Sequence, residues 1–360
     1  MNRTRATGAA ATLTLAAIVL AGCAASDGGG ESDGSGETLT LGISADLQSW
    51  APQDQSGGPG LVWLQPVYDT LLLAEPDGTV APMLATDWTY SNGNKTLELD
   101  LRDDVTFTDG TAFTADAVKV NLEANRDGGG PLASGLKFVT DVTVVDDDTV
   151  QLELSAPDPY LITALTRPTG AIASPELVAS GEAKSEPVGT GPYIYDAAQS
   201  TVGSEYVFTA NPDYWDASRV KFGTIVYKPI TDATASLNAL QSGQIQGTIG
   251  DTFSIDQAKS AGLTVTTSDG SDLYGLYLLD RDGTIAPQLA DARVRQAMNL
   301  VFDRQAITDA LYAGYGVPTS QIFAPGSSGW VPDLEGANEL DIDKAKSLLS
   351  EAGHHDRVSI

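Results

Sequence analysis

Side chains that could carry out covalent or acid–base chemistry are scarce in this 360-residue sequence. Cys23 is the only cysteine, and the adjacent His354 and His355 are the only histidines. A histidine-based triad, a cysteine nucleophile or a Cys/His zinc cluster therefore has almost nothing to be built from in the body of the protein. The sequence also contains no phosphate-binding loop and no nucleophile elbow. We predict no catalytic residue and no metal site.

The residues around Cys23 predict that its sulfur carries a lipid. Arg3 and Arg5 form a short basic start, and residues 9–20 are an almost unbroken apolar run. This run is too short to span a bilayer, which takes roughly 20 residues, so residues 1–22 are interpreted as a signal peptide. Leu20-Ala21-Gly22-Cys23 resembles the lipobox of bacterial lipoproteins, whose cysteine carries a diacylglyceryl group. The resemblance implies a two-chain anchor on Cys23, which is enough for stable attachment, and no other cofactor.

Residues 23–37 are predicted to be the lipidated cysteine and a flexible tether. After Cys23 this segment contains only Ala, Ser, Gly, Asp and Glu, so it cannot bury enough apolar surface to become ordered. The expected arrangement is a body anchored to the outer face of the bacterial cell membrane, in the periplasmic or cell-wall space.

The composition disfavours nucleic acid as a partner. The chain has 20 Lys and Arg against 48 Asp and Glu, which gives a formal net charge of -28. Because a surface this acidic repels phosphate backbones, we interpret the acidity as a contribution to solubility. The hydrophobic share of 42% is enough for a core, and the length predicts two or more lobes.

Hydrophobic patterns in the first half predict strands and hairpins. Residues 38–43 alternate as a strand does, and residues 61–72 form an apolar, helix-like segment. Asn92-Gly93 separates two alternating runs, which is a strong hairpin signal. Residues 142–145 and 149–154 predict another hairpin, whose three linking aspartates we interpret as a solvated turn and not as a calcium loop.

The pattern changes from residue 222 onward to alternating strands and helices. Strands are predicted at 222–230, 245–249 and 263–267, and helices after Thr231-Asp232 and at 255–261. This alternation is typical of an α/β lobe with a partly parallel sheet. Further helices are predicted at 293–302, 306–313 and 343–352.

Short motifs follow one another in a fixed order along the chain. They are VYDTL at 67–71, APMLATDW at 81–88, LRDDVTFTDG at 101–110, TADAV at 114–118, GTGPY at 189–193, NPDYW at 211–215, DARVRQA at 291–297 and DKAKSLL at 343–349. Each motif alone is weak, but the ordered set over residues 38–353 resembles the family 5 extracellular solute-binding proteins. These are the peptide, dipeptide and nickel receptors of ATP-binding-cassette (ABC) importers.

The resemblance implies an α/β, bilobal cleft fold of the periplasmic-binding-protein kind. Lobe I is expected to combine residues 38–60 with 180–268, and a hairpin-rich subdomain at 61–179 is expected to be inserted into it. Residues 269–360 are expected to begin lobe II. Family members usually continue for well over a hundred further residues, so the resemblance implies a truncated second lobe.

The resemblance also implies a function without catalysis. The expected protein captures extracellular peptides and delivers them to an ABC permease with its ATPase subunits. An oligosaccharide receptor, a truncated non-functional remnant and a secreted hydrolase with paired carboxylates remain as alternatives. Nickel and haem are disfavoured as solutes, because the body of the chain lacks histidine.

The residues expected to bind the solute come from four places. By analogy with the family, the loop before the inserted subdomain approaches the ligand backbone, through Ser56, Gly57, Gly58 and Leu61. A plain flexible loop is the alternative for these residues. Trp50 is a candidate wall of the cleft, although a Trp in the core or on the surface is an equal alternative.

The other expected contacts lie later in the chain. Asp251 and Thr252 follow a predicted strand end, where ligands of α/β proteins often bind, with a solvated turn as the alternative. Tyr274 and Tyr277 lie where the chain is expected to cross between lobes, so they are candidates for the hinge or the cleft.

Overall fold

The computed structural model describes residues 36–55, 59–267, 273–323, 325 and 329–354. The predicted signal peptide, Cys23 and the glycine loop at 56–58 lie outside the described residues. Within the described part of the chain, none of the helices combines the length and the apolar character needed to cross a bilayer.

A mixed five-stranded sheet forms the first layer. Its strand order is β11-β1-β10-β9-β8. Strand β1 runs parallel to both β10 and β11, whereas β10, β9 and β8 are antiparallel to one another. The bounds are Thr38–Ile43 for β1, Tyr193–Thr201 for β8, Glu205–Ala210 for β9, Thr224–Pro229 for β10 and Gly247–Thr248 for β11. The predicted strand at 38–43 and the partly parallel sheet are therefore confirmed.

Aromatic side chains fill the core beside this sheet. Trp63 lies edge-on to Tyr206, with ring centroids 4.7 Å apart, and Phe208 lies 5.1 Å from Tyr227. The indole N–H of Trp63 donates to the backbone oxygen of Ala45 at 3.1 Å. Because Trp63 belongs to helix α1, Pro59–Leu64, this packing fixes α1 against the sheet.

The segment after α1 differs from the prediction. The helix-like pattern at 61–72 gives a helix only to Leu64, followed by strand β2, Leu72–Ala74, which pairs with β3, Val80–Pro82. Pro66 explains the early end, because proline lacks the N–H that a continuing helix needs and clashes with the preceding turn.

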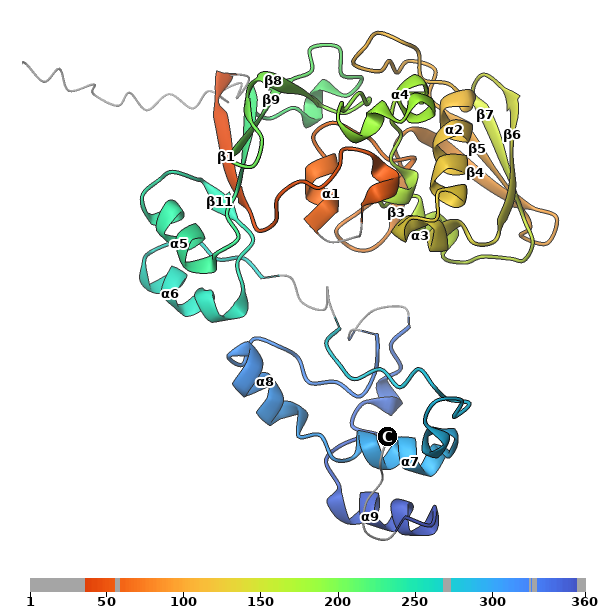
Figure 1. The fold of residues 1–360 in the computed structure, drawn as a ribbon, viewed down its shortest axis with the longest axis vertical. Helices are drawn as coiled ribbons and strands as arrows, with labels where there is room; N and C mark the ends of the chain where they lie inside the picture. Colours follow the sequence, from red (N-terminus) through yellow and green to blue (C-terminus); the bar gives the residue numbers. More distant parts are fainter. Residues whose placement is uncertain (1–35, 56–58, 268–272, 324, 326–328, 355–360) are drawn as a thin grey trace, which may run out of the picture.

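A second sheet and a long helix form the hairpin-rich part. The sheet order is β4-β5-β7-β6, and helix α2 covers one face of it (Figure 1). Leu99 of β5 and Val150 of β7 are register partners, and both are fully buried with Val118 and Leu122 of α2. Both predicted hairpins are confirmed. The bounds are Ala85–Ser91 for β4, Thr96–Leu101 for β5, Ala115–Asp127 for α2, Val139–Asp146 for β6 and Thr149–Leu154 for β7.

Short α-helices lie between these strands and after the last of them. They are α3, Leu161–Ala164, α4, Pro175–Ser180, α5, Ala233–Gln241, and α6, Ile255–Ser260. Asp232 caps α5 as predicted, accepting a hydrogen bond from the backbone N–H of Ala235 at 2.7 Å. The predicted strand at 263–267 is wrong. Strand β11 ends the sheet, so this apolar alternation has no neighbouring strand to pair with.

In the described part of the chain, three α-helices follow residue 290 and lie away from both sheets (Figure 1). They are α7, Ala292–Asn299, α8, Arg304–Tyr312, and α9, Ile342–Glu351. Helices α7 and α9 share a small core of Ala297, Leu300 and Ala345.

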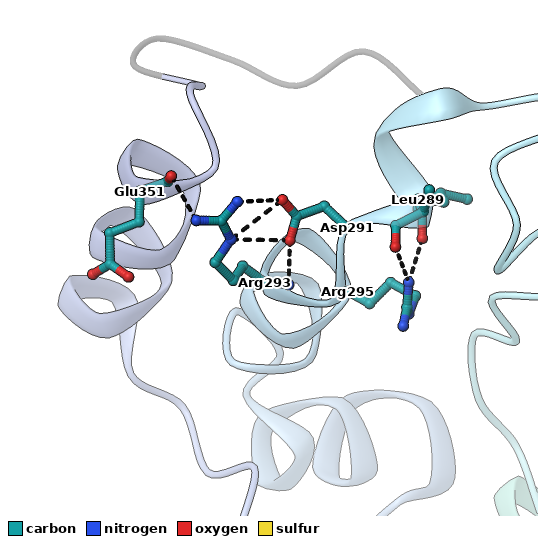
Figure 2. A network of polar contacts seen from close by, with 6 residues as sticks. Leu289, Asp291, Arg293, Arg295 and Glu351 are labelled. Carbon is teal, nitrogen blue, oxygen red and sulfur yellow. Dashed lines mark hydrogen bonds and ion pairs between the residues drawn. The ribbon is translucent and has the colours of Figure 1, made fainter.

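Figure 2 shows how the motif at 291–297 stabilises this pair of helices. Asp291 caps α7 and accepts from the guanidinium of Arg293, with a shortest distance of 2.6 Å. These bonds from Arg293 lower the pKa of Asp291 to about 2. Arg293 also donates to the backbone oxygen of Glu351 at 2.7 Å, and Arg295 donates to the backbone oxygens of Leu289 and Ala290. The motif therefore joins the start of α7 to the end of α9.

Candidate functional site

A cavity of about 400 Å³ lies where α1 and the chain after it meet β2, Met83 and three later stretches, at 166–171, 192 and 214–219. Its apolar wall includes Leu61 and Leu64 of α1, Leu73 of β2, and Met83. Its polar wall includes Tyr68, Asp69, Thr70, Thr166, Arg167, Tyr214 and Arg219. An apolar pocket with a few polar groups is the usual form of a small-molecule site.

Close backbone packing positions the wall that contains Tyr68 and Asp69. The N–H of Gly191 donates to the backbone oxygen of Val67 at 3.1 Å, and the N–H of Tyr193 donates to that of Pro66 at 2.8 Å. A Cβ atom on Gly191 would lie 2.5 Å from the carbonyl carbon of Val67. Glycine at this position therefore allows the motif GTGPY to contact the motif VYDTL directly.

Asp69 is the centre of a buried hydrogen-bond network at this wall. Its side chain is only 2% exposed and accepts from the hydroxyl of Tyr214 at 3.0 Å, the indole N–H of Trp215 at 2.9 Å and the hydroxyl of Thr190 at 3.2 Å. Burial raises the pKa of Asp69 to about 6, although these three bonds and the nearby charge of Arg219 oppose the increase. The network joins three of the sequence motifs.

Two residues that line the cavity have side-chain groups with unused hydrogen-bonding capacity. The hydroxyl of Tyr68 is buried and has no partner among the described residues, and burial raises the pKa of Tyr68. The guanidinium of Arg167 forms no hydrogen bond or ion pair with the described part of the chain. Arg219, by contrast, donates to the sulfur of Met83 at 2.8 Å and lies 4.0 Å from the carboxylate of Asp216.

The described lining of the cavity holds a single carboxylate and no metal cluster. Asp69 is the one carboxylate on the wall among the described lining residues, and its two oxygens already accept three hydrogen bonds. Acid–base hydrolysis by paired carboxylates needs a second carboxyl group nearby. In the ranges that the structure describes, no three His, Cys, Asp or Glu side chains are gathered where they could hold a metal ion.

The structure places the predicted solute contacts in different surroundings. Leu61 lies on the cavity wall, whereas Ser56, Gly57 and Gly58 lie outside the described residues. Trp50 is 4% exposed and packs in the aromatic core, with its ring centroid 4.9 Å from that of Tyr195. This burial matches the core alternative for Trp50 and leaves it little surface for a solute.

The later contacts lie outside this cavity. Asp251 is exposed and caps the 3-10 helix Thr252–Ser254, accepting from the N–H of Ser254 at 2.8 Å. Tyr274 is 72% exposed and packs at a tilt against Tyr312 of α8, with ring centroids 5.3 Å apart, and Tyr277 is 58% exposed. Their predicted contact with solute stays a prediction.

Sequence reasoning did not find the polar groups of the cavity. Tyr68, Asp69 and Tyr214 belong to motifs that carry the family resemblance but were not proposed as solute contacts, and Arg167 and Arg219 lie outside every motif. Arginine and lysine are rare in this sequence, at 20 in 360 residues, and this rarity could have marked each of them as a candidate for the site. Residues 68, 167 and 219 are, however, far apart in the sequence, so no local pattern predicts that they line one cavity.

Comparison with known proteins places this geometry in a family. The glutathione-binding protein GsiB of Salmonella typhi is 28% identical over 330 residues, which cover 89% of this chain and 62% of GsiB. A putative ABC transporter peptide-binding protein of Brucella ovis is 28% identical over 305 residues, covering 82% and 56%. This chain thus spans about three fifths of the length of these curated relatives.

The fold is also that of solved binding proteins. The periplasmic binding protein AgaA of A. tumefaciens R10, solved with agropinic acid, superposes with a TM-score of 0.72 at 24% identity, covering 88% of this chain and 65% of AgaA. The expected α/β cleft fold is confirmed, whereas the truncated second lobe and the domain boundaries stay predictions. The family described as "Bacterial extracellular solute-binding proteins, family 5 Middle" matches residues 79–359. The resemblance seen in the ordered motifs is therefore confirmed, and the chain belongs to the family 5 bacterial extracellular solute-binding proteins.

Proposed function

We propose that this protein is a lipid-anchored receptor that captures extracellular peptides and delivers them to an ABC permease and its ATPase subunits. The observation that carries the proposal is the family match over residues 79–359. The relatives support a peptide as the solute, since one is a glutathione-binding protein and another a putative peptide-binding protein.

The cavity supports binding of a small solute. Its volume of about 400 Å³ lies within the range of small-molecule sites. We propose that Leu61 and the preceding Ser56, Gly57 and Gly58 contact the solute, because Leu61 already lies on the wall. Thr252, which is half-buried, and the exposed Asp251, Tyr274 and Tyr277 are proposed to contact a longer ligand or to form the hinge.

Solute binding is expected to be stoichiometric and without turnover. The full chain is titrated with trialanine, pentaalanine and glutathione by calorimetry, and the peptides are recovered and weighed by mass spectrometry. We expect at least one of them to bind at one molecule per chain and to be recovered intact. Cleaved peptide would instead support a hydrolase, and the absence of binding by a chain that unfolds cooperatively would contradict the receptor function.

The lipid anchor is proposed on the sequence of residues 20–23. Replacement of Cys23 by Ser (Cys23→Ser) is expected to move the protein from the membrane fraction of the bacterium to the soluble fraction, because the thioether cannot form. Fractionation followed by immunoblotting measures this shift, and the mass of the wild-type amino-terminal fragment shows the lipid directly. Wild-type protein in the soluble fraction would contradict the anchor and leave the solute proposal intact.

A further inference from the structure

We propose that Tyr315 is a latch that holds residues 273–354 against helix α6 and so limits how far the two parts of the chain move relative to each other. The first part is residues 36–267 and the second part is residues 273–354. Three observations carry the inference: the hydroxyl of Tyr315 bridges two charged side chains of α6, a tight turn positions Tyr315, and the two parts have separate cores.

The hydroxyl of Tyr315 forms hydrogen bonds in both directions. It donates to Oδ1 of Asp256 at 2.7 Å and accepts from Nζ of Lys259 at 3.2 Å. Asp256 and Lys259 are three residues apart in α6, so they lie on the same face of this helix. Hydrogen bonds to charged partners are about twice as strong as those between neutral groups. A hydroxyl donates and accepts at one oxygen, which a phenyl ring cannot do.

A tight turn after α8 positions Tyr315. Ala313 and Gly314 have positive φ angles of 50° and 79°, which change the direction of the chain where α8 ends. The N–H of Gly314 donates to the backbone oxygen of Thr308 at 3.3 Å, and the N–H of Tyr315 donates to that of Tyr312 at 2.9 Å. A left-handed conformation is unfavourable for alanine and persists only where the surrounding structure enforces it. The backbone that carries Tyr315 is therefore held firmly on α8.

The apolar cores of the two parts are separate in the ranges that the structure describes. The clusters beside the two sheets take their side chains from residues 41–227, whereas the cluster of Ala297, Leu300 and Ala345 belongs to the second part. Parts joined without a large apolar interface are expected to move relative to each other. Among the described residues, the hydrogen bonds that oppose such movement are those of Tyr315.

The position that Tyr315 fixes also concerns the cavity. The described residues that line the cavity all lie between Leu61 and Arg219, so in the latched arrangement its wall comes from the first part alone. The position of the second part can therefore be measured without any solute, and the latch is tested independently of the proposed receptor function.

The test measures the separation of the two parts in the full chain carrying Cys23→Ser, in which labels attach only to introduced cysteines. Spin labels are placed at Ser204→Cys, between β8 and β9, and at Lys346→Cys in α9, because both positions are exposed. Double electron–electron resonance then gives the distribution of distances between the two labels.

Three variants of this labelled chain are compared with it. Tyr315→Phe removes the hydroxyl and keeps the ring, and Asp256→Ala removes the acceptor from the other side of the contact. Tyr274→Phe is the matched control, because Tyr274 belongs to the same part and its ring contact with Tyr312, at 5.3 Å between centroids, needs no hydroxyl. Thermal unfolding of each variant checks that the fold is intact.

We expect a narrow distance distribution for the labelled chain and for Tyr274→Phe, and one at least about twice as wide for Tyr315→Phe. The reason is that loss of two charge-assisted bonds shifts an equilibrium between held and released parts by about tenfold or more. Asp256→Ala should widen the distribution to a similar extent, and the double variant should add little, since both changes act on one contact.

Three results would overturn the latch: an unchanged width in Tyr315→Phe, an equal widening in Tyr274→Phe, or a distribution that is already wide in the labelled chain. Fully additive widening in the double variant would also overturn it, because the two side chains would then act separately. Each of these results leaves the receptor function standing, since no solute takes part in the measurement.

Discussion

Replacement of Asp69 by Ala is expected to lower the free energy of unfolding by about 3–5 kcal/mol. The change removes the acceptor for three donors, on Thr190, Tyr214 and Trp215, and leaves them buried or half-buried without a partner. Each unsatisfied buried donor costs about 1–3 kcal/mol. Denaturant unfolding followed by tryptophan fluorescence measures the loss. Asp213→Ala is the matched control, because Asp213 lies in the same NPDYW motif but is exposed.

The raised pKa gives Asp69 a pH signature that a purely steric role would not have. The pKa of Asp69 is about 6 in the folded state, against 3.8 for an aspartate in the unfolded chain. The protonated side chain therefore contributes to the stability of the folded state at low pH, and this contribution is lost as the pH rises through about 6. The shift corresponds to roughly 3 kcal/mol. Asp69→Asn removes this titration, so the difference in unfolding free energy between wild type and variant should change between pH 4 and 7. A constant difference over that range would contradict the burial argument.

Replacement of Gly191 by Ala should cost about 3 kcal/mol or more, or prevent folding. The new Cβ atom would meet only backbone, at 2.5 Å from the carbonyl carbon of Val67 and 2.8 Å from both Pro66 and Tyr68. Backbone held by hydrogen bonds cannot move aside as a flexible side chain can. Because Tyr68 lines the cavity, any chain that does fold should also bind its solute less tightly.

Gly275→Ala is the control for Gly191→Ala. A Cβ atom on Gly275 would have open space around it, so the unfolding midpoint in denaturant should stay close to that of wild type. Circular dichroism of both variants at equal concentration gives the comparison. A Gly191→Ala variant as stable as Gly275→Ala would show that the two motifs do not pack as closely as the structure has them.

Local patterns predicted most elements of this fold, because each depends on neighbours in the sequence. The Asn92-Gly93 turn is one example, since both residues have the positive φ angles, 51° and 65°, that such a hairpin turn needs. The strand predicted at 263–267 failed because a distant partner decides: these residues alternate well but have no strand beside them. The helix predicted over 61–72 failed for a local reason, because Pro66 ends a helix that apolar content alone would extend.

The candidate site was predicted only at Leu61. Its polar side chains come from residues 65 to 219, and their proximity depends on how the motif at 189–193 packs on that at 67–71. Trp50 shows the opposite difficulty. A large aromatic residue serves equally well in a core or in a cleft, and only the packing on Tyr195, Tyr206 and Phe208 distinguishes the two.

The parallel pairing of β1 with β10 also sets the order in which the chain can fold as it is synthesised. Thr38 pairs with Thr224, and Leu41 pairs with Gly247, so β1 has no partner until most of the chain has left the ribosome. The sheet of β4 to β7 can close within residues 85–154 long before that. Long-range pairing of this kind is slow, because loop closure must precede the contacts that stabilise it. Strand β1 therefore joins the five-stranded sheet late. The segment that follows the proposed signal peptide thus stays unpaired during synthesis.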